Sequence, residues 1–196
     1  MPAMKMSPLN KIMVAVALLG GAAGANVPAA EPTAFQLFKE GNKYLGEQSK
    51  DKVVQARSEK SIAGLVPNVW HIVYYDPDTT FKSQEIKFGA GRKLDQRRPW
   101  RMIETVTGDK VLPAEKLKVD SDEAIKTAIK EPLLEKLKLQ ATQLWLDRGD
   151  ENPTWKVRIW AQKLRNPRQD ADIGDVYVDA KTGKVTRTDL HINRVD

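Results

Sequence analysis

The sequence predicts an α+β fold made of two similar units, each a helix packed on an antiparallel sheet. Two stretches, residues 33–48 and 120–129, have apolar residues at the three- and four-residue spacing of a helix. Each is followed by strand-like segments, one of which is led by a tryptophan: Trp70 in the first half and Trp155 in the second. These tryptophans lie 85 residues apart, and helix, strand, turn, tryptophan-led strand, polar turn and strand follow in the same order in both halves. We interpret this order as an internal repeat.

The first unit is expected at residues 33–108. Its helix at 33–48 begins at Thr33, whose hydroxyl can accept a free backbone N–H as an N-cap. Alternating residues predict a strand at 54–58, and the β-branched and aromatic residues of 69–75 predict a second strand. Further strands of this unit are expected at 82–88 and 100–106.

The second unit is expected at residues 109–196. Asp120 is placed to cap its helix at 120–129, and Glu123 three residues later is typical of a capping box. Strict alternation of apolar and polar residues at 155–161 predicts a half-buried strand. Further strands of this unit are expected at 137–148, 173–178 and 185–192.

A hairpin turn at 179–183 joins the last two of these strands. Asp179 and Thr182 can accept backbone N–H bonds across the turn, and Gly183 supplies the left-handed conformation that the turn needs. We expect these three residues to have a structural role rather than a binding role.

The N-terminus has the pattern of a cleavable secretory signal. Lys5 and Lys11 precede an uncharged apolar run at 12–19, and the small residues after it end in an Ala-Gly-Ala triplet. The run is shorter than the roughly 20 residues of a membrane-spanning helix, and no other run approaches that length. The alternative is an uncleaved anchor or a buried helix. We expect removal of residues 1–25, a flexible lead-in at 26–32, and a mature protein without a transmembrane segment in the bacterial periplasm or outside the cell.

The composition excludes several classes of protein. The formal charge is +6, but the 32 lysines and arginines are scattered among 26 acidic residues. A nucleic-acid-binding protein would gather its cations on one face, so we expect no nucleic-acid partner. The absence of cysteine excludes thiol catalysis, a cysteine-ligated metal and a lipid-modified cysteine anchor.

Three segments of the second half resemble the PepSY domain. They are DSDEAIKTAI at 120–129, TWKVR at 154–158 and GDVYVDAKTGKV at 174–185, and the last is the most characteristic. The resemblance covers roughly 115–192 and, through the repeat, extends more weakly to 33–95. It implies an antiparallel sheet with a packed helix, a secreted or periplasmic location and no catalytic residues. Similar domains occur in metallopeptidase propeptides, so a peptidase is one partner that the resemblance implies, although no peptidase domain or zinc motif follows here.

No residue pattern points to a metal, a cofactor or catalysis. His71 and His191 each lie in a predicted strand without a neighbouring ligand, and zinc needs three or four converging ligands. Asp170, Asp172 and Asp175 lack the glycine and terminal glutamate of a calcium loop, which favours a solvated acidic loop. There is also no nucleophile-elbow motif.

The candidate binding residues are rich in arginine and tryptophan, which are common at interface hot spots. They are Arg97, Arg98, Trp100, Arg101 and Trp160. The first four belong to a basic segment at 92–101, for which an exposed connector with a buried Trp100 is preferred to a binding role, because a run of charge is usually a solvated face. Trp160 falls on the polar side of its strand, so it is either covered by the other unit or an exposed contact.

These observations favour an exported binding protein without catalysis. We expect it to recognise a peptide or protein through a face or an edge of its sheet. The resemblance to the PepSY domain implies that this partner is a peptidase whose activity the protein modulates. One alternative is an enzyme whose site lies between the two units. The other is an envelope component that binds anionic surfaces through residues 92–101.

Overall fold

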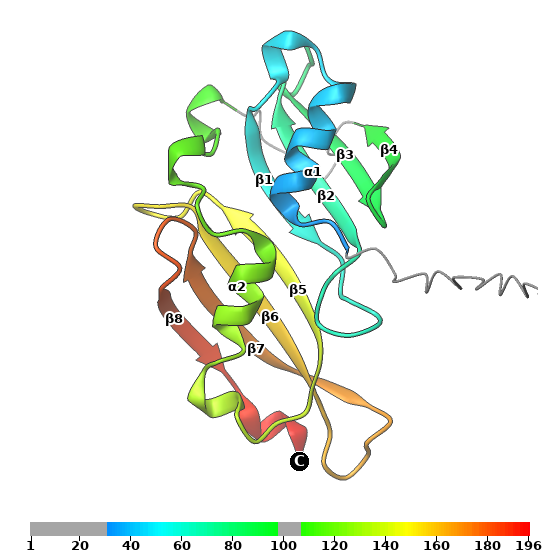
Figure 1. The fold of residues 1–196 in the computed structure, drawn as a ribbon, viewed down its shortest axis with the longest axis vertical. Coiled ribbons are helices and arrows are strands. Elements are labelled where there is room, and N and C mark those ends of the chain that lie inside the picture. The colour runs from blue at the N-terminus through cyan, green and yellow to red at the C-terminus, as the bar shows by residue number, and fades with distance from the viewer. Residues whose placement is uncertain (1–30, 98–106) are drawn as a thin grey trace, which may run out of the picture.

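The computed structural model describes residues 31–97 and 107–196 (Figure 1). The predicted signal at 1–25, the strand predicted at 100–106, and the candidate residues Arg98, Trp100 and Arg101 lie outside the described residues.

The described strands form one antiparallel sheet of eight strands in the order β4-β3-β2-β1-β5-β6-β7-β8. The chain runs from the middle of the sheet to one edge, returns to the middle, and then runs to the other edge (Figure 1). The strands are β1 (Val53–Ser58), β2 (Val69–Tyr75), β3 (Ser83–Gly89), β4 (Arg92–Arg97), β5 (Leu139–Asp147), β6 (Thr154–Gln162), β7 (Asp170–Asp179) and β8 (Val185–Leu190).

The predicted fold class, with two units that each have a helix on their own sheet, is wrong. Strand β1 pairs with β5 in the middle of the molecule, so both halves belong to one sheet. The apolar side chains of both halves also form one core cluster, in which Trp70 and Trp155 meet edge to face at 6.3 Å. Two separate four-stranded sheets would each leave an unpaired inner edge, and the β1–β5 pairing removes both of these edges.

Two serine side chains extend the contact between β1 and β5 beyond the residues that pair in the sheet. Among the described residues of β1 and β5, Ala56–Leu146 and Arg57–Trp145 are the paired positions, and past the end of β1 the Ser61 N–H donates to the Thr142 carbonyl at 2.8 Å. Beyond them, the buried Ser58 hydroxyl accepts the N–H of Leu144 at 2.8 Å. In the same way, the Ser61 hydroxyl accepts the N–H of Thr142 at 2.9 Å. These hydroxyls satisfy backbone donors that would otherwise be buried without partners.

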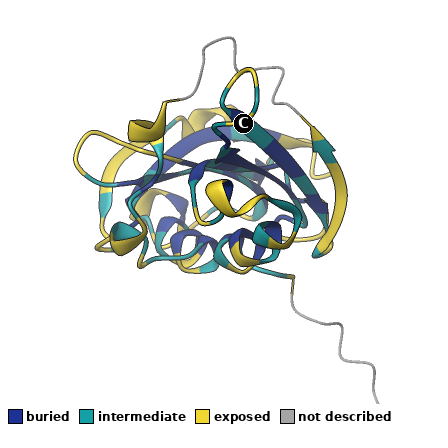
Figure 2. Ribbon diagram, turned by 90° about the horizontal axis from the view of Figure 1, so that it is seen from above, coloured by how far each residue is buried: buried dark blue, intermediate teal, exposed yellow. Residues whose placement is uncertain are grey.

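Two α-helices of eight residues, α1 (Ala34–Gly41) and α2 (Ser121–Ala128), cover one face of the sheet. Figure 2 shows the sheet arched over them, so the helices and the core occupy its concave side and the other face is convex. The helix predicted at 33–48 is therefore too long: after Gly41 the chain continues in 3₁₀ turns. Short 3₁₀ helices are found at Asn42–Tyr44, Glu47–Ser49, Gly108–Lys110, Ala114–Lys116, Pro132–Leu134 and Ile192–Val195.

The two helices begin side by side and share their caps. Thr33 is the N-cap of α1, as predicted, and forms a capping box with Gln36. Asp120 is the N-cap of α2, but its carboxylate accepts the N–H of Ser121 and, at 3.1 Å, the N–H of Phe35 in α1. A capping residue of one half thus stabilises the first turn of the helix in the other half.

The basic connector predicted at 92–101 is wrong for residues 92–97, because Arg92–Arg97 form an edge strand, β4, of the sheet; residues 98–101 lie outside the described residues. The turn at 179–183 is ordered by Asp179, whose carboxylate accepts the N–H groups of Lys181 and Thr182 at 2.8 Å each. The Thr182 hydroxyl accepts the N–H of Lys184 at 3.4 Å, and Gly183 has a φ of 73°.

Candidate functional site

The convex face of the sheet carries a row of polar and aromatic side chains, one from each strand. We call it the central row. From edge to edge it consists of Asp95, Lys87, His71, Arg57, Trp145, Lys156, Tyr177 and Arg187, each a cross-strand partner of the next. Eight strands at about 4.8 Å spacing give the row a length of about 34 Å.

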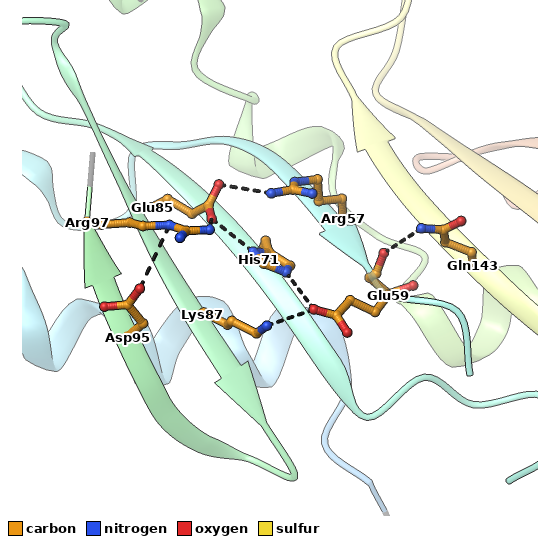
Figure 3. A network of polar contacts seen from close by, with 9 residues as sticks. Arg57, Glu59, His71, Glu85, Lys87, Asp95, Arg97 and Gln143 are labelled. Carbon is orange, nitrogen blue, oxygen red and sulfur yellow. Dashed lines mark hydrogen bonds and ion pairs between the residues drawn. The ribbon is translucent and has the colours of Figure 1, made fainter. Parts of the chain in front are cut away.

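In the β1–β4 half, the row lies around a buried carboxylate (Figure 3). Glu85 accepts hydrogen bonds from His71 Nδ1 at 2.9 Å, from Arg57 at 3.2 Å and from Arg97 at 3.3 Å. Its side chain is only 5% exposed. Burial alone would raise the pKa of Glu85, but the hydrogen bonds from His71 and Arg57 outweigh it and lower the pKa to about 2.

The His71 ring lies between two carboxylates. Its Nδ1 faces Glu85, and its Nε2 lies 3.2 Å from Glu59 Oε1, which also accepts a hydrogen bond from Lys87 at 2.8 Å. Each ring nitrogen therefore has a carboxylate oxygen within hydrogen-bond distance. In this arrangement no ring nitrogen is free to take a proton from a substrate.

The β5–β8 half has a second buried carboxylate at the corresponding position. Asp175 accepts hydrogen bonds from Arg158 at 2.9 and 3.2 Å and lies 3.2 Å from Lys156 Nζ. Burial would raise the pKa of Asp175, but the hydrogen bonds from Arg158 and Lys156 outweigh it, so the pKa is lower than usual. Both cations also lie 5.4 Å from the centre of the Trp145 ring.

The strand register makes the two carboxylates equivalent. On β3, Phe88 pairs with Trp70, and Glu85 lies three residues before Phe88. On β7, Val178 pairs with Trp155, and Asp175 lies three residues before Val178. His71 and Lys156 are likewise equivalent, because each directly follows the tryptophan of its half. Each half of the sheet therefore holds a buried acid on its third strand beneath cations from neighbouring strands.

Charge on the convex face is arranged in two layers. Glu85 and Asp175 are 5% and 9% exposed, whereas the arginine and lysine side chains that they bind are 21% to 43% exposed; His71 is buried beside Glu85. Glu85 and Asp175 lie beneath these cations and fix them, and the side chains above them along the middle of the row carry guanidinium, ammonium and aromatic groups. More exposed acids flank this layer: Glu59 beside Lys87, Asp95 beside Arg97 and Asp172 beside Arg158 are 49%, 50% and 37% exposed. Such a layer can bind carboxylate or other anionic groups through charge-assisted hydrogen bonds.

The residues singled out from the sequence lie at different places in the structure. Arg97 belongs to the Glu85 network, and Trp160 lies on the convex face with the Lys60 ammonium 4.7 Å from its ring centre. Asp170 is paired with Lys60, and His191 is an exposed residue beside Asp189. In the described ranges 31–97 and 107–196, no three His, Cys, Asp or Glu side chains gather in a way that could hold a metal ion.

Sequence reasoning missed Glu85, Lys156 and Arg187 as members of one surface. The alternation at 155–161 already assigns Lys156 to the polar side of its strand, whereas the apolar run at 69–75 shows no such alternation for His71. The signal that was lacking is the pairing between strands, which brings Glu85 from β3 beneath cations of β1 and β4.

Comparison with models of protein families, with curated proteins and with solved structures finds no match for this chain. The resemblance to the PepSY domain and the peptidase partner that it implies therefore stay predictions. In the part of the chain that the structure describes, no helix has the length and apolar character needed to cross a membrane.

Proposed function

We propose that this protein is an exported, non-catalytic binding protein whose convex sheet face binds an acidic segment of a protein partner. The observation that carries the proposal is the layering of charge, with the buried acids Glu85 and Asp175 beneath more exposed cations. Export is supported by the N-terminal pattern of Lys5, Lys11 and the apolar run at 12–19.

Preorganisation favours this function. Arg57, Lys156 and Arg158 are already held by carboxylates, so a ligand does not have to immobilise these long side chains when it binds. An extended segment advances about 3.3 Å per residue, so about ten residues would follow the whole central row.

The absence of catalysis in this proposal is supported by the position of His71. Its two nitrogens are occupied by Glu59 and Glu85, and no described serine, threonine or tyrosine hydroxyl is hydrogen-bonded to it. A nucleophile and a base in contact with each other, which a hydrolase of the serine type requires, are thus not found at this histidine.

The test is the binding of a fluorescein-labelled, C-terminally amidated peptide of about ten residues that alternates glutamate with alanine. Fluorescence anisotropy should show binding that weakens at high salt, and no binding of the same peptide with lysine in place of glutamate. The double variant Lys87→Gln/Lys156→Gln should bind the acidic peptide about tenfold more weakly, a loss of about 1.4 kcal/mol.

The matched control is Lys39→Gln/Lys130→Gln, which removes the same charge from exposed lysines on the helix side of the protein. The proposal predicts nearly unchanged binding for this control. Equal losses in both double variants, or equal binding of the lysine peptide, would contradict it. Tight binding of anionic lipid vesicles without binding of the acidic peptide would also overturn it.

A further inference from the structure

The central row ends in a pocket on the β5–β8 half of the convex face. The pocket has a volume of about 410 Å³ and lies between the β5–β6 turn and strand β8. Lys156, Tyr177 and Arg187, the last three members of the row, line it together with Thr154 and Thr186. Asp147 at the end of β5 and Gly149 and Asp150 in the β5–β6 turn complete the lining.

Arg187 is the distinctive group of this pocket. Its guanidinium carbon lies 3.9 Å from the centre of the Tyr177 ring, so the two groups are stacked. Stacking uses the flat face of a guanidinium and leaves the N–H groups at its edges available for hydrogen bonds. Arg57, Arg97 and Arg158 each bind a carboxylate, whereas no carboxylate of the described residues lies within ion-pair distance of Arg187.

We infer that this pocket holds one carboxylate of the acidic partner segment, with Arg187 as its anchor. The inference rests on the function proposed above and adds a defined subsite to it. The fork of N–H groups on an arginine matches the two oxygens of a carboxylate, and Lys156, which lies two strands away on β6 and also lines the pocket, adds a second positive charge.

The acids of the pocket restrict which anions can bind. Asp147, the last residue of β5, accepts a hydrogen bond from the Gln55 amide at 2.6 Å, and Asp150 lies in the turn that follows. Two carboxylates at the rim repel a small, highly charged anion such as inorganic phosphate. They can instead accept N–H groups, which a peptide backbone supplies beside its carboxylate. A carboxylate on a polypeptide therefore fits the pocket better than a free inorganic anion.

A carboxylate of this kind can come from an acidic side chain or from a chain terminus. Three probes distinguish the sources: the amidated glutamate–alanine peptide, a glutamine–alanine peptide with a free C-terminus, and the amidated glutamine–alanine peptide. The first two carry carboxylates of different origin, and the third carries none. Inorganic phosphate serves as a competitor.

Arg187→Gln should weaken the binding of whichever carboxylate peptide binds the wild-type protein by about tenfold, and Arg187→Lys should weaken it less because the charge remains. Arg165→Gln, which removes the charge of an exposed arginine that does not line this pocket, is the matched control and should leave binding unchanged. The NMR signal of the Arg187 Nε–H group should shift on titration with the peptide and not with the third probe.

The outcomes separate this inference from the proposed function. If Arg187→Gln binds the acidic peptide as wild type does while Lys87→Gln/Lys156→Gln does not, the subsite is refuted and the binding face stands. Competition by phosphate at the affinity of the peptide refutes selectivity for a carboxylate on a polypeptide. If neither carboxylate peptide binds the wild-type protein, both the subsite and the proposed function are refuted.

Discussion

Glu85→Gln tests the buried carboxylate of the β1–β4 half directly, because glutamine keeps the shape of the side chain and removes its charge. The pKa of Glu85 is about 2 in the folded protein, against an ordinary value of 4.5. One pKa unit corresponds to about 1.4 kcal/mol, so ionised Glu85 stabilises the folded state by about 3 kcal/mol at neutral pH. Glu85→Gln should lose this amount.

The pH dependence has a definite sign. Because the folded pKa lies below the unfolded one, the stabilisation is fully present above pH 4.5 and is lost as the pH falls from 4.5 toward 2. Below that window wild-type Glu85 is protonated and resembles glutamine. The difference in unfolding free energy between the wild type and Glu85→Gln should therefore shrink with falling pH.

Urea unfolding followed by circular dichroism, at neutral pH and at about pH 3, measures this difference. Asp95→Asn is the control, because Asp95 lies on the same face but is half exposed and 3.8 Å from Arg97. It should cost less than about 0.5 kcal/mol. A difference for Glu85→Gln that stays constant with pH, or that is below about 1 kcal/mol at neutral pH, would refute the linkage between Glu85 and its cations.

Two further substitutions, measured by the same urea unfolding, test individual buried hydrogen bonds of the fold. Ser58→Ala should cost about 1–3 kcal/mol, because it leaves the buried N–H of Leu144 without a partner. Ser49→Ala is its control and should change stability by less than about 0.5 kcal/mol, since the Ser49 hydroxyl is buried and has no hydrogen-bond partner among the described residues. Tyr74→Phe should cost about 1 kcal/mol, because the buried Tyr74 hydroxyl donates to the Phe38 carbonyl at 3.0 Å; unchanged stability would show that this bond contributes nothing.

Local features of the fold could be predicted from the sequence because their causes are local. Thr33 and Asp120 cap their helices through groups within a few residues, although Asp120 also bonds Phe35 of the other half. The alternation at 155–161 lies within β6, whose core-facing residues are all buried. In each of these cases, residues within the segment itself are enough to predict the helix or strand.

The single sheet could not be predicted because its central join is not marked in the sequence. Ser58 and Ser61 accept backbone N–H groups from β5, yet a serine at the end of a strand is as typical of a solvent-exposed position. Strand β4 was missed for a related reason: it is an edge strand, and the side chains of Arg92–Arg97 are largely exposed on both faces, so no apolar alternation is present.

The candidate site could be predicted only in part, because its central contacts join residues that are far apart in the sequence. Arg97 and Trp160 were selected as charged and aromatic residues outside the core pattern, and both lie on the convex face or its edge. Glu85 looks like an ordinary strand glutamate in the sequence. Its burial depends on Arg57, which is 28 residues away in the chain and reaches Glu85 across β2.

The two halves of the convex face are equivalent in their buried acids but differ in their outward side chains. The buried acid is present in both halves as Glu85 and Asp175, whereas the outward positions differ: Lys87 in one half corresponds to Tyr177 in the other. The aromatic rings of the central row, Trp145 and Tyr177, belong to the β5–β8 half. Aromatic and arginine groups contribute most at binding hot spots, while ionic contacts mainly steer association. If the convex face binds an acidic segment, its affinity should therefore depend mostly on the β5–β8 half, and the β1–β4 half should mainly set orientation and salt dependence.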